Sequence, residues 1–251
     1  MEINQTNLTA SNPACHHFGL TTIHPNALQL YSANTPNGMK ISLMLEELMD
    51  MRIVDGDVLY EAHTINLRNT PPDTRTANFL KINPNGKIPA LFDPTTKSTI
   101  FESGAILIYL AEKYHELLPE KSGTRFEVLK WTFWSCTGLS SSIKSFGHYF
   151  KFCQHNLPYA IERYAREVNR LLLCLENHLA AEPHKHWIAG DLYTIADISA
   201  WPWISALKSN YPGSEKYFHL EEKYPNVITW MKRIQARPAA QRCYDVTPIS
   251  I

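Results

Sequence analysis

The stretch over residues 101–114, Phe-Glu-Ser-Gly-Ala-Ile-Leu-Ile-Tyr-Leu-Ala-Glu-Lys-Tyr, limits the possible folds more than any other part of the chain. Phe101 closes a short apolar run of the kind that forms a strand. After Ser103, apolar residues at positions 106, 107, 110 and 111 follow helical spacing. Serine is also favoured at a helix N-terminus. The stretch therefore predicts a strand that turns directly into a helix over 103–114.

Glu102 and Ser103 stand where this helix is expected to begin. A helix start offers free backbone N–H groups and a partial positive charge. Combined with a hydroxyl and an acidic side chain, it suits a ligand that carries a carboxylate next to an ammonium, such as a free amino acid or a γ-glutamyl group. A plain helix cap is the alternative interpretation of the same pair.

The residues before this stretch alternate between strand and helix patterns. Strands are predicted over 27–31, 63–67, 88–92 and 98–101, a helix over 37–49 and a short one over 76–80. The predicted order is β-α-β-α-β-β-α. Pro89 near the start of the third strand cannot donate to a ladder. A cis peptide bond between Ile88 and Pro89 is one explanation.

The residues after position 114 show no strand alternation. Residues 115–123 are predicted to be a linker, and 124–151 and 158–181 are long amphipathic segments rich in Trp, Phe and Leu. Thr194-Ile-Ala-Asp197 is a capping box with Asp in place of Glu, followed by an apolar helix over 198–207. Pro225 opens a further helix that runs to Ile234. We therefore expect an all-helical domain over 124–251.

Composition excludes several classes of function. The 24 basic and 24 acidic side chains balance, which gives no indication of a nucleic-acid partner or of an anionic membrane surface. The 11 histidines are scattered rather than set at metal-ligand spacing, so no metal site is predicted. The five cysteines form no Cys-x-x-Cys pair, and no run has the length of a signal-peptide core or a membrane span. We expect reduced thiols and a cytoplasmic protein.

These motifs together resemble the cytosolic glutathione transferases over residues 27–245. The strand–helix order, Ile88-Pro89, Glu102-Ser103 and the capping box carry the resemblance. Within that superfamily, the segments around Thr35, Asn83-Pro-Asn-Gly-Lys-Ile-Pro89 and Tyr159-Ala-Ile-Glu-Arg-Tyr164 are similar to the bacterial nu class and to fungal proteins like the yeast nitrogen regulator. The resemblance implies a thioredoxin-like α/β domain over 26–114, followed by the all-helical domain. Residues 1–25 are expected to be a poorly ordered extension.

The resemblance also implies a glutathione site, residue by residue. The family proline that matches Pro89 is cis, and the backbone matching Ile88 pairs with the cysteinyl unit. The pair matching Glu102 and Ser103 holds the γ-glutamyl end, and Lys87 would lie near the glycyl carboxylate. Glutathione is thereby expected as a cosubstrate, without a metal.

Thr35 and Asn37 fall where the nu class makes polar contacts to the glutathione sulfur. The same residues also suit a turn followed by a helix cap, and the two roles are compatible. Tyr31 and Ser32 are competitors, because other classes place a catalytic Tyr or Ser at this junction. Core packing is the favoured interpretation of Tyr31. No cysteine lies in the turn, which disfavours the classes that form a mixed disulfide with the enzyme.

Nu-class proteins are associated with glutathione-dependent disulfide reduction, with peroxide reduction and conjugation as related activities. The resemblance therefore implies such an enzyme, acting as a homodimer, and Arg163 is the matching candidate to hold a second tripeptide. A surface ion pair is the alternative for Arg163. A non-catalytic regulator with a glutathione-binding fold is the alternative function. Residues 138–150 depart from the Gly-Pro-Met pattern of the relatives. In the family this stretch lines the side of the site that binds the second substrate. The resemblance therefore does not specify which second substrate binds or whether a second tripeptide does.

Overall fold

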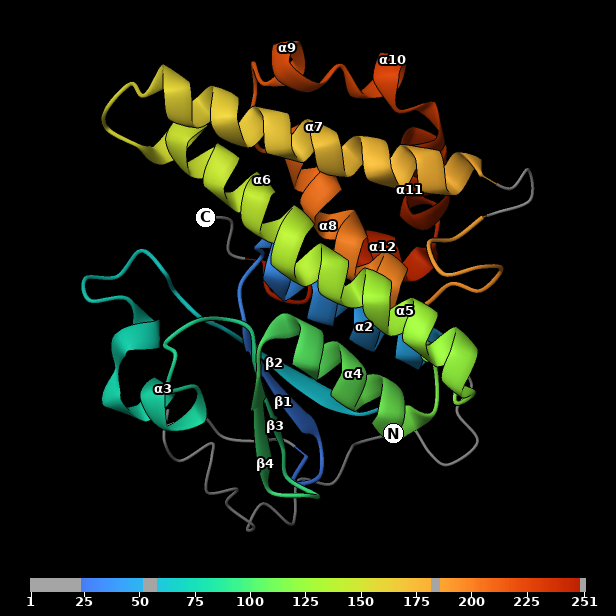
Figure 1. Cartoon of the computed structure of the whole chain (residues 1–251). Coiled ribbons are helices and arrows are strands. Elements are labelled where there is room, and N and C mark those ends of the chain that lie inside the picture. Colours follow the sequence, from blue (N-terminus) through green and yellow to red (C-terminus); the bar gives the residue numbers. More distant parts are fainter. Residues whose placement is uncertain (1–23, 52–57, 182–185, 249–251) are drawn as a thin grey trace, which may run out of the picture.

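The computed structural model describes residues 24–51, 58–181 and 186–248. A mixed four-stranded sheet with its helices forms one part, and a group of helices forms the other (Figure 1). This α/β-plus-helical architecture confirms the predicted fold class. The predicted N-terminal extension lies almost entirely outside the described residues, as does Cys15.

The sheet has the strand order β2-β1-β3-β4. Its strands are β1 (Leu28–Ser32), β2 (Tyr60–Thr64), β3 (Ala90–Asp93) and β4 (Ser98–Phe101). β2 runs parallel to β1, whereas β3 runs antiparallel to both β1 and β4. The central strands are buried on both faces, so they read as apolar runs rather than as strict alternation.

The second strand is not where the sequence predicts it. The prediction was 63–67, but β2 spans Tyr60–Thr64 and pairs with the whole of β1, from Leu28↔Tyr60 to Ser32↔Thr64. Ile65 still donates from its backbone N–H to the carbonyl of Ser32, at 2.7 Å. The ladder ends there because β1 ends at Ser32, where the chain turns into the next helix.

The helices of this part are α2 (Pro36–Asp50), the short 3₁₀ helix η1 (Asp73–Arg75), α3 (Ala77–Ile82) and α4 (Ser103–Tyr114). α4 has the predicted bounds. One face of the sheet packs on α2 and α4 through side chains that include Leu28, Leu30 and Leu91. The other face packs on α3 through a smaller apolar cluster that contains Tyr31, Ala90 and Phe92 (Figure 1).

The helical part begins with four segments that follow one another without a break: α5 (Ser122–Trp134), η2 (Ser135–Leu139), α6 (Ser140–Gly147) and η3 (His148–Phe152). η2 and η3 are π-helical turns. The others are α7 (Pro158–Ala180), α8 (Ile195–Ser209), α9 (Glu215–Phe218), α10 (Leu220–Lys223), α11 (Pro225–Gln235) and α12 (Pro238–Arg242). The linker predicted over 115–123 covers the interval between α4 and α5, but α5 already begins at Ser122.

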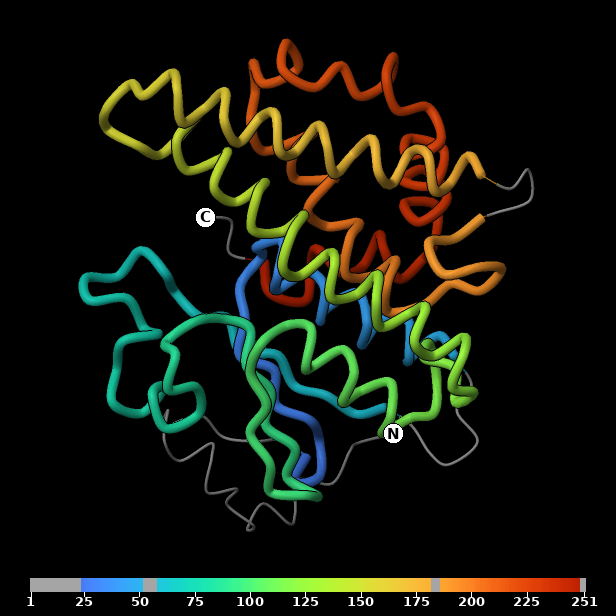
Figure 2. Tube along the Cα trace, viewed as in Figure 1, coloured from blue at the N-terminus to red at the C-terminus, as the bar shows by residue number. Residues whose placement is uncertain are grey.

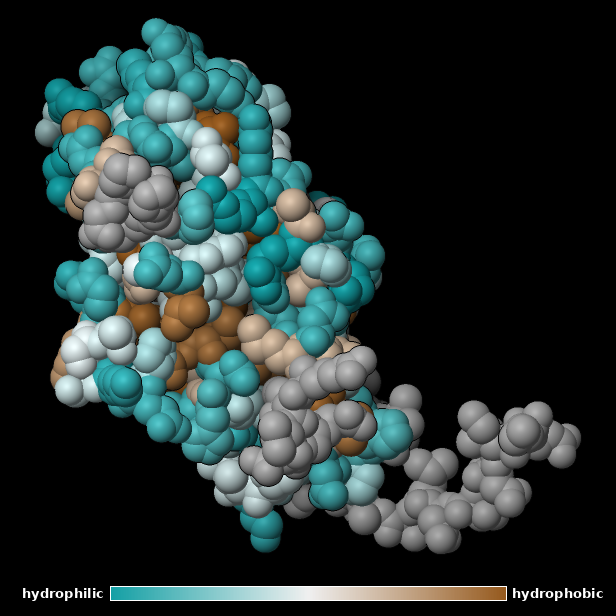
Figure 3. Space-filling view, turned by 90° about the vertical axis from the view of Figure 1, so that its right-hand side faces the viewer, coloured by the Kyte–Doolittle hydropathy of each residue, from teal (hydrophilic) through white to brown (hydrophobic). Residues whose placement is uncertain are grey.

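α8 is the buried helix between the two parts. Twelve of its residues are buried, and it packs against α2 on one side and α5 on the other. The last helix, α12, returns to the sheet part and packs on α2 (Figure 2). On the face shown in Figure 3, hydrophobic residues gather in the middle of the molecule, between the helical part above and the sheet part below. Within the described ranges, no helix is both long and apolar enough to span a membrane.

Candidate functional site

The turn between β1 and α2 is fixed by its own residues. The Thr35 Oγ1 atom accepts from the backbone N–H of Gly38 at 3.1 Å, and Pro36 occupies the first helical position. Gly38 has no space for a side chain, since a Cβ there would lie 2.1 Å from the carbonyl oxygen of Ala33. The helix-cap interpretation of Thr35 is confirmed. Asn37 follows in the first turn of α2.

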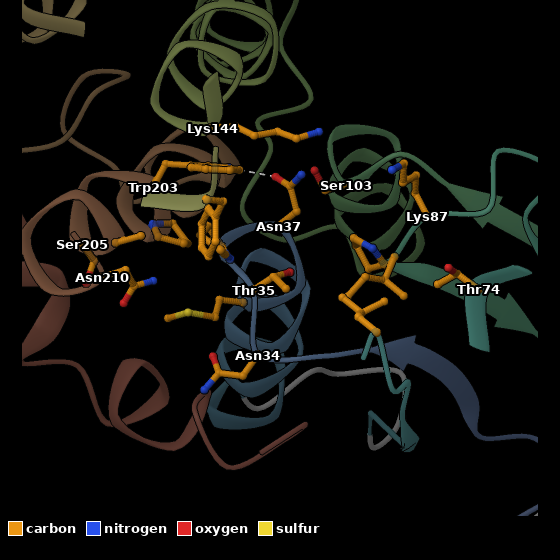
Figure 4. Close-up of a pocket in the computed structure, with 18 of the residues that line it drawn as sticks. Asn34, Thr35, Asn37, Thr74, Lys87, Ser103, Lys144, Trp203, Ser205 and Asn210 are labelled. Atoms are coloured by element: carbon orange, nitrogen blue, oxygen red, sulfur yellow. Dashed lines mark hydrogen bonds between the residues drawn. The ribbon is translucent and has the colours of Figure 1, made fainter. Parts of the chain in front are cut away.

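A second segment, from Asn83 to Pro89, forms the facing wall. The Ile88–Pro89 peptide bond is cis, as the sequence suggested. The side-chain amide of Asn83 donates to the carbonyl of Lys87 at 2.6 Å and fixes the loop before the bond. Lys87 is exposed, Ile88 half-buried and Pro89 buried. The backbone around the cis bond therefore faces the same space as the start of α2 (Figure 4).

The start of α4 completes this wall, although its cap differs from the expectation. Ser103 is the first helical residue and is buried, while Glu102 holds the capping position with φ 71° and makes no side-chain capping bond. The pair therefore stands at the start of the helix, as predicted, but the Glu102 side chain does not cap it. A left-handed φ is uncommon outside glycine and is often found at functional sites. The exposed Glu102 carboxylate accepts from Asn85 Nδ2 at 3.3 Å.

These segments border a cavity of about 880 Å³ between the sheet part and the helical part. Seven of the eight predicted site residues line it: Thr35, Asn37, Lys87, Ile88, Pro89, Glu102 and Ser103. In Figure 4, Thr35 and Asn37 lie between the wall that carries Lys87 and Ser103 and the wall that carries Trp203. The sequence motifs are thus brought together around one space.

Arg163 is the predicted residue that does not line this cavity. It lies on α7, exposed, with its guanidinium over the ring of Tyr164 at 5.8 Å. The competitors Tyr31 and Ser32 are also absent from the lining, because both are completely buried. Tyr31 stacks on His63 with 4.9 Å between ring centroids, which confirms core packing as its role.

The wall from the helical part carries residues that no sequence motif indicated. They include Lys144, Lys151, Phe152, Trp203 and Tyr211. Lys144 belongs to the 138–150 stretch. The departure of that stretch from the relatives' pattern is the sequence feature that could have pointed to this wall. In the sequence, Trp203 is one of several apolar residues in a predicted helix, and nothing there indicates a role in the site. Its indole Nε1–H donates to Asn37 Oδ1 at 2.9 Å.

Behind the start of α2 lies a buried lysine, Lys40. Its Nζ atom donates to Ser140 Oγ at 3.1 Å and lies 3.8 Å from Cys136 Sγ. Burial lowers the pKa of Lys40, while the neighbouring Cys136 and Glu102 act to raise it. No cysteine among the described residues lines the cavity. No group of His, Cys, Asp or Glu in the described part of the chain could hold a metal ion.

Two family models match the chain. Residues 51–113 match the glutathione S-transferase N-terminal domain, and residues 158–233 match the C-terminal domain. The disulfide-bond oxidoreductase YghU of Escherichia coli is 40% identical over 223 residues, which are 87% of this chain and 74% of that protein.

Solved structures agree with this match. A glutathione transferase from Burkholderia graminis, with two glutathione molecules bound per subunit, superposes with a TM-score of 0.84 at 34% identity and covers 99% of each chain. One from Pseudomonas putida, with one glutathione disulfide bound per subunit, gives 0.82 at 31% identity and covers 95% of this chain and 98% of that one. The chain therefore belongs to the glutathione S-transferase family, among its YghU-like members.

Proposed function

We propose that this protein is a glutathione-dependent disulfide-bond reductase. The observation that carries the proposal is the cavity itself, in which the residues expected to hold glutathione face a cationic and aromatic wall and no cysteine is among the lining residues. Its relative YghU is named a disulfide-bond oxidoreductase. The two solved relatives hold two glutathione molecules or one glutathione disulfide per subunit, and thiol–disulfide exchange brings two sulfur-bearing molecules together.

The first glutathione is proposed to lie along the wall from the sheet part. Glu102 and Ser103 would hold the ammonium and carboxylate of the γ-glutamyl end at the start of α4. The backbone of Ile88 beside Pro89 would pair with the cysteinyl unit, and the exposed ammonium of Lys87 would attract the glycyl carboxylate. This arrangement directs the sulfur toward Thr35 and Asn37 at the start of α2.

The sulfur must be a thiolate to react. A thiol with a pKa of about 8.5 is mostly protonated at neutral pH. Lowering its pKa by one unit requires about 1.4 kcal/mol of differential stabilisation. A hydroxyl hydrogen from Thr35, an amide hydrogen from Asn37 and the helix N-terminus together supply interactions of that size.

The reaction then proceeds in two exchanges. The first glutathione thiolate attacks one sulfur of the substrate disulfide, whose S–S bond breaks, and the other substrate sulfur leaves as a thiolate that takes up a proton. A second glutathione thiolate attacks the glutathione sulfur of the mixed disulfide, releasing the second substrate thiol and glutathione disulfide. Two glutathione molecules are oxidised and one disulfide is reduced, while the protein holds the sulfurs in line.

The second tripeptide carries carboxylates that need cations. Lys144 and Lys151 line the cavity from the helical part of the chain. Lys151 donates to the carbonyl of Asn210 at 2.9 Å, which leaves its other two N–H groups for a ligand. We assign the second tripeptide to these two lysines. The role predicted for Arg163 would require a ligand that extends beyond the cavity.

Glutathione titrations of Glu102→Ala and Ser103→Ala test the proposal, with Glu162→Ala as a control at an exposed position outside the cavity. The two site variants should raise KM for glutathione about tenfold with little change in kcat, because they remove binding to the unreactive end. Lower kcat with unchanged KM would contradict the γ-glutamyl role. A wild-type protein that binds glutathione but reduces no model disulfide, reduces no peroxide and conjugates no electrophile would favour the non-catalytic regulator.

We also propose that the protein is a homodimer. Phe126 and Phe133 lie seven residues apart on α5, so they share a face, and they are 68% and 57% exposed. Large exposed apolar side chains on one face mark a protein contact. Sedimentation should give a dimer for the wild type and a monomer for the Phe126→Glu/Phe133→Glu double variant. The same sedimentation coefficient for both would reject this face as the interface.

We place the protein in the cytoplasm. The four cysteines in the described ranges, Cys136, Cys153, Cys174 and Cys243, are all free thiols. Reduced cysteines and a requirement for reduced glutathione both fit a reducing compartment.

A further inference from the structure

We infer that Trp203 is a positioning residue, which holds the amide of Asn37 with its NH₂ group directed at the sulfur of bound glutathione. The inference rests on the proposed function, because it assigns a cause to the activation of that sulfur. It places a requirement for catalysis in the helical part of the chain, far in sequence from the glutathione motifs.

The two side chains meet across the boundary between the two parts. Asn37 stands in the first turn of α2, and Trp203 stands 166 residues later in the middle of α8. Trp203 is only 5% exposed. Its indole N–H donates to Asn37 Oδ1 at 2.9 Å. The bond is therefore made by a buried donor on a helix that has twelve buried residues.

This bond selects one of the two orientations of the amide. The amide of Asn37 has an oxygen that only accepts and a nitrogen that only donates, in nearly the same shape. The indole N–H of Trp203 is a donor and offers no acceptor. The amide oxygen must therefore face the indole N–H, because the amide NH₂ in that place would set two donors against each other. In Figure 4 the amide nitrogen of Asn37 points away from Trp203, toward the side on which Ser103 lies.

The orientation decides the sign of the interaction with the sulfur. With Oδ1 held by Trp203, the two N–H groups of Asn37 are available to stabilise a thiolate in the cavity. With the amide reversed, the carbonyl oxygen would face the same sulfur, and its partial negative charge would disfavour the thiolate. The amide of Asn37 can therefore lower the thiol pKa consistently only if its oxygen is held away from the sulfur.

The fold holds Trp203 firmly enough to do this. α8 is launched by the buried capping box of Thr194 and Asp197, and the same Asp197 accepts from the indole N–H of Trp230 on α11 at 2.8 Å. α8 packs directly on α2. The donor and the residue it orients are thus carried by two helices whose relative position is set by the core.

The first test is Trp203→Phe, which keeps an aromatic ring and removes the donor. Trp201→Phe is the matched control, since Trp201 is buried on the same helix and does not line the cavity. We expect Trp203→Phe to raise the thiol pKa of bound glutathione by about one unit, read from the ultraviolet absorbance of the thiolate, and to change the glutathione Kd less than about twofold. Trp201→Phe should leave the pKa unchanged. An unchanged pKa in Trp203→Phe would overturn the inference.

A double-variant cycle separates positioning from packing. If Trp203 acts through Asn37, then Trp203→Phe should have no further effect on the thiol pKa in an Asn37→Ala background. An equal rise in both backgrounds would show that Trp203 acts by another route. Should Trp203→Phe fail to fold, Asn37→Asp decides the question. It can still accept from Trp203 but cannot donate, so it should raise the thiol pKa by at least about one unit. No rise there would overturn the inference.

The outcome for the wild type separates this inference from the proposed function. A wild-type protein that binds no glutathione, or that leaves the thiol pKa at its value in free solution, would contradict the proposed function itself. A wild-type protein that lowers the thiol pKa, together with a Trp203→Phe protein that lowers it equally, would contradict only the role of Trp203.

Discussion

At the scale of single residues, Thr35 combines two roles in one hydroxyl. Its oxygen accepts from the backbone N–H of Gly38 and so caps α2. A hydroxyl also has one hydrogen to donate, and it can do so while its oxygen accepts. The side chain that starts the helix can therefore also donate to the glutathione sulfur. The structural and the proposed catalytic interpretations of Thr35 do not compete.

Thr35→Ala should lose both roles, and Thr35→Ser should keep both. Loss of the cap costs about 1 kcal/mol of stability. Loss of one donor to a charged sulfur costs about 1.5–3 kcal/mol, which predicts about a tenfold or larger fall in disulfide turnover. Turnover and thermal melting of the three proteins check this. Normal turnover in Thr35→Ala would move the sulfur contact to Asn37 alone.

Seven of the eight predicted site residues line the cavity, and the sequence indicated them because they lie in the short motifs that carry the family resemblance. Each of these motifs is contiguous in the chain, so it can be recognised without knowledge of the packing. Trp203 and Lys144 could not be found in this way. Their partners and the cavity they share are brought near them by the packing of helices, and nothing in their own neighbourhood marks them.

At the scale of elements, the start of α8 depends on one buried carboxylate. Asp197 accepts from the backbone N–H groups of Thr194 at 3.0 Å and Ile188 at 2.9 Å, and from the indole of Trp230 at 2.8 Å. The capping box predicted from the sequence is confirmed. The bonds to Ile188 and Trp230 were not predicted, and they make Asp197 a junction of three segments rather than a local cap.

Asp197→Ala should therefore be more destabilising than the loss of a cap. It leaves three buried donors without an acceptor, so we expect a loss of about 3 kcal/mol in the free energy of unfolding. Thr194→Ala is the control and should cost about 1 kcal/mol. Denaturant unfolding of both variants measures this, with glutathione affinity as the second readout. Equal losses in the two variants would contradict the junction role, as would normal stability with abolished glutathione binding.

The same carboxylate makes stability depend on pH. Burial raises the pKa of Asp197 to about 6, against the bonds from Ile188, Trp230 and Thr194, which act to lower it. The folded state then binds this proton more tightly than the unfolded chain. The resulting stability is fully present below about pH 4 and is lost as the pH rises through about 6, by about 3 kcal/mol. The stability difference between wild type and Asp197→Asn should fall over that range. A constant difference would contradict the raised pKa.

Elements with a strong local signal were predicted closely, and the others were not. α4 has a uniform helical period and definite boundaries, and it was found at the bounds predicted. β2 was predicted three residues too late, because its extent is set by pairing with β1 rather than by its own residues. The pattern over 63–67 is apolar enough for a strand, but β1 offers no partner beyond Ser32.

At the scale of the whole molecule, α2 joins the two parts by charge as well as by packing. Glu47 on α2 is buried, and its carboxylate accepts from Nε and Nη2 of Arg237, at 2.6 and 2.7 Å. Arg237 lies in the segment between α11 and α12. The guanidinium also lies over the ring of Tyr193 at 4.2 Å. A second pair joins Glu46 to Arg242 on α12. Sequence could not reveal these pairs, because the partners lie about 190 positions apart.

Arg237→Met should leave the carboxylate of Glu47 buried without its partner. We expect the free energy of unfolding to fall by about 3 kcal/mol. Arg170→Met is the matched control, since Arg170 pairs with Glu167 on the exposed side of α7, where an ion pair contributes little. Chemical denaturation of the two variants makes the comparison. Similar midpoints would show that the Glu47–Arg237 pair does not hold the two parts together.

In the proposed mechanism, the attacking sulfur belongs to glutathione and not to the protein. The most direct measurement is the turnover of a model disulfide, with glutathione as reductant, by a protein in which all five cysteines are replaced by serine or alanine. Cys136 lies beside Lys40 and Cys243 is buried, so the fold and glutathione binding are verified first. The proposed mechanism predicts that most of the wild-type turnover remains between about pH 6 and 9. A cysteine-free protein that is folded and binds glutathione but reduces no disulfide would contradict it.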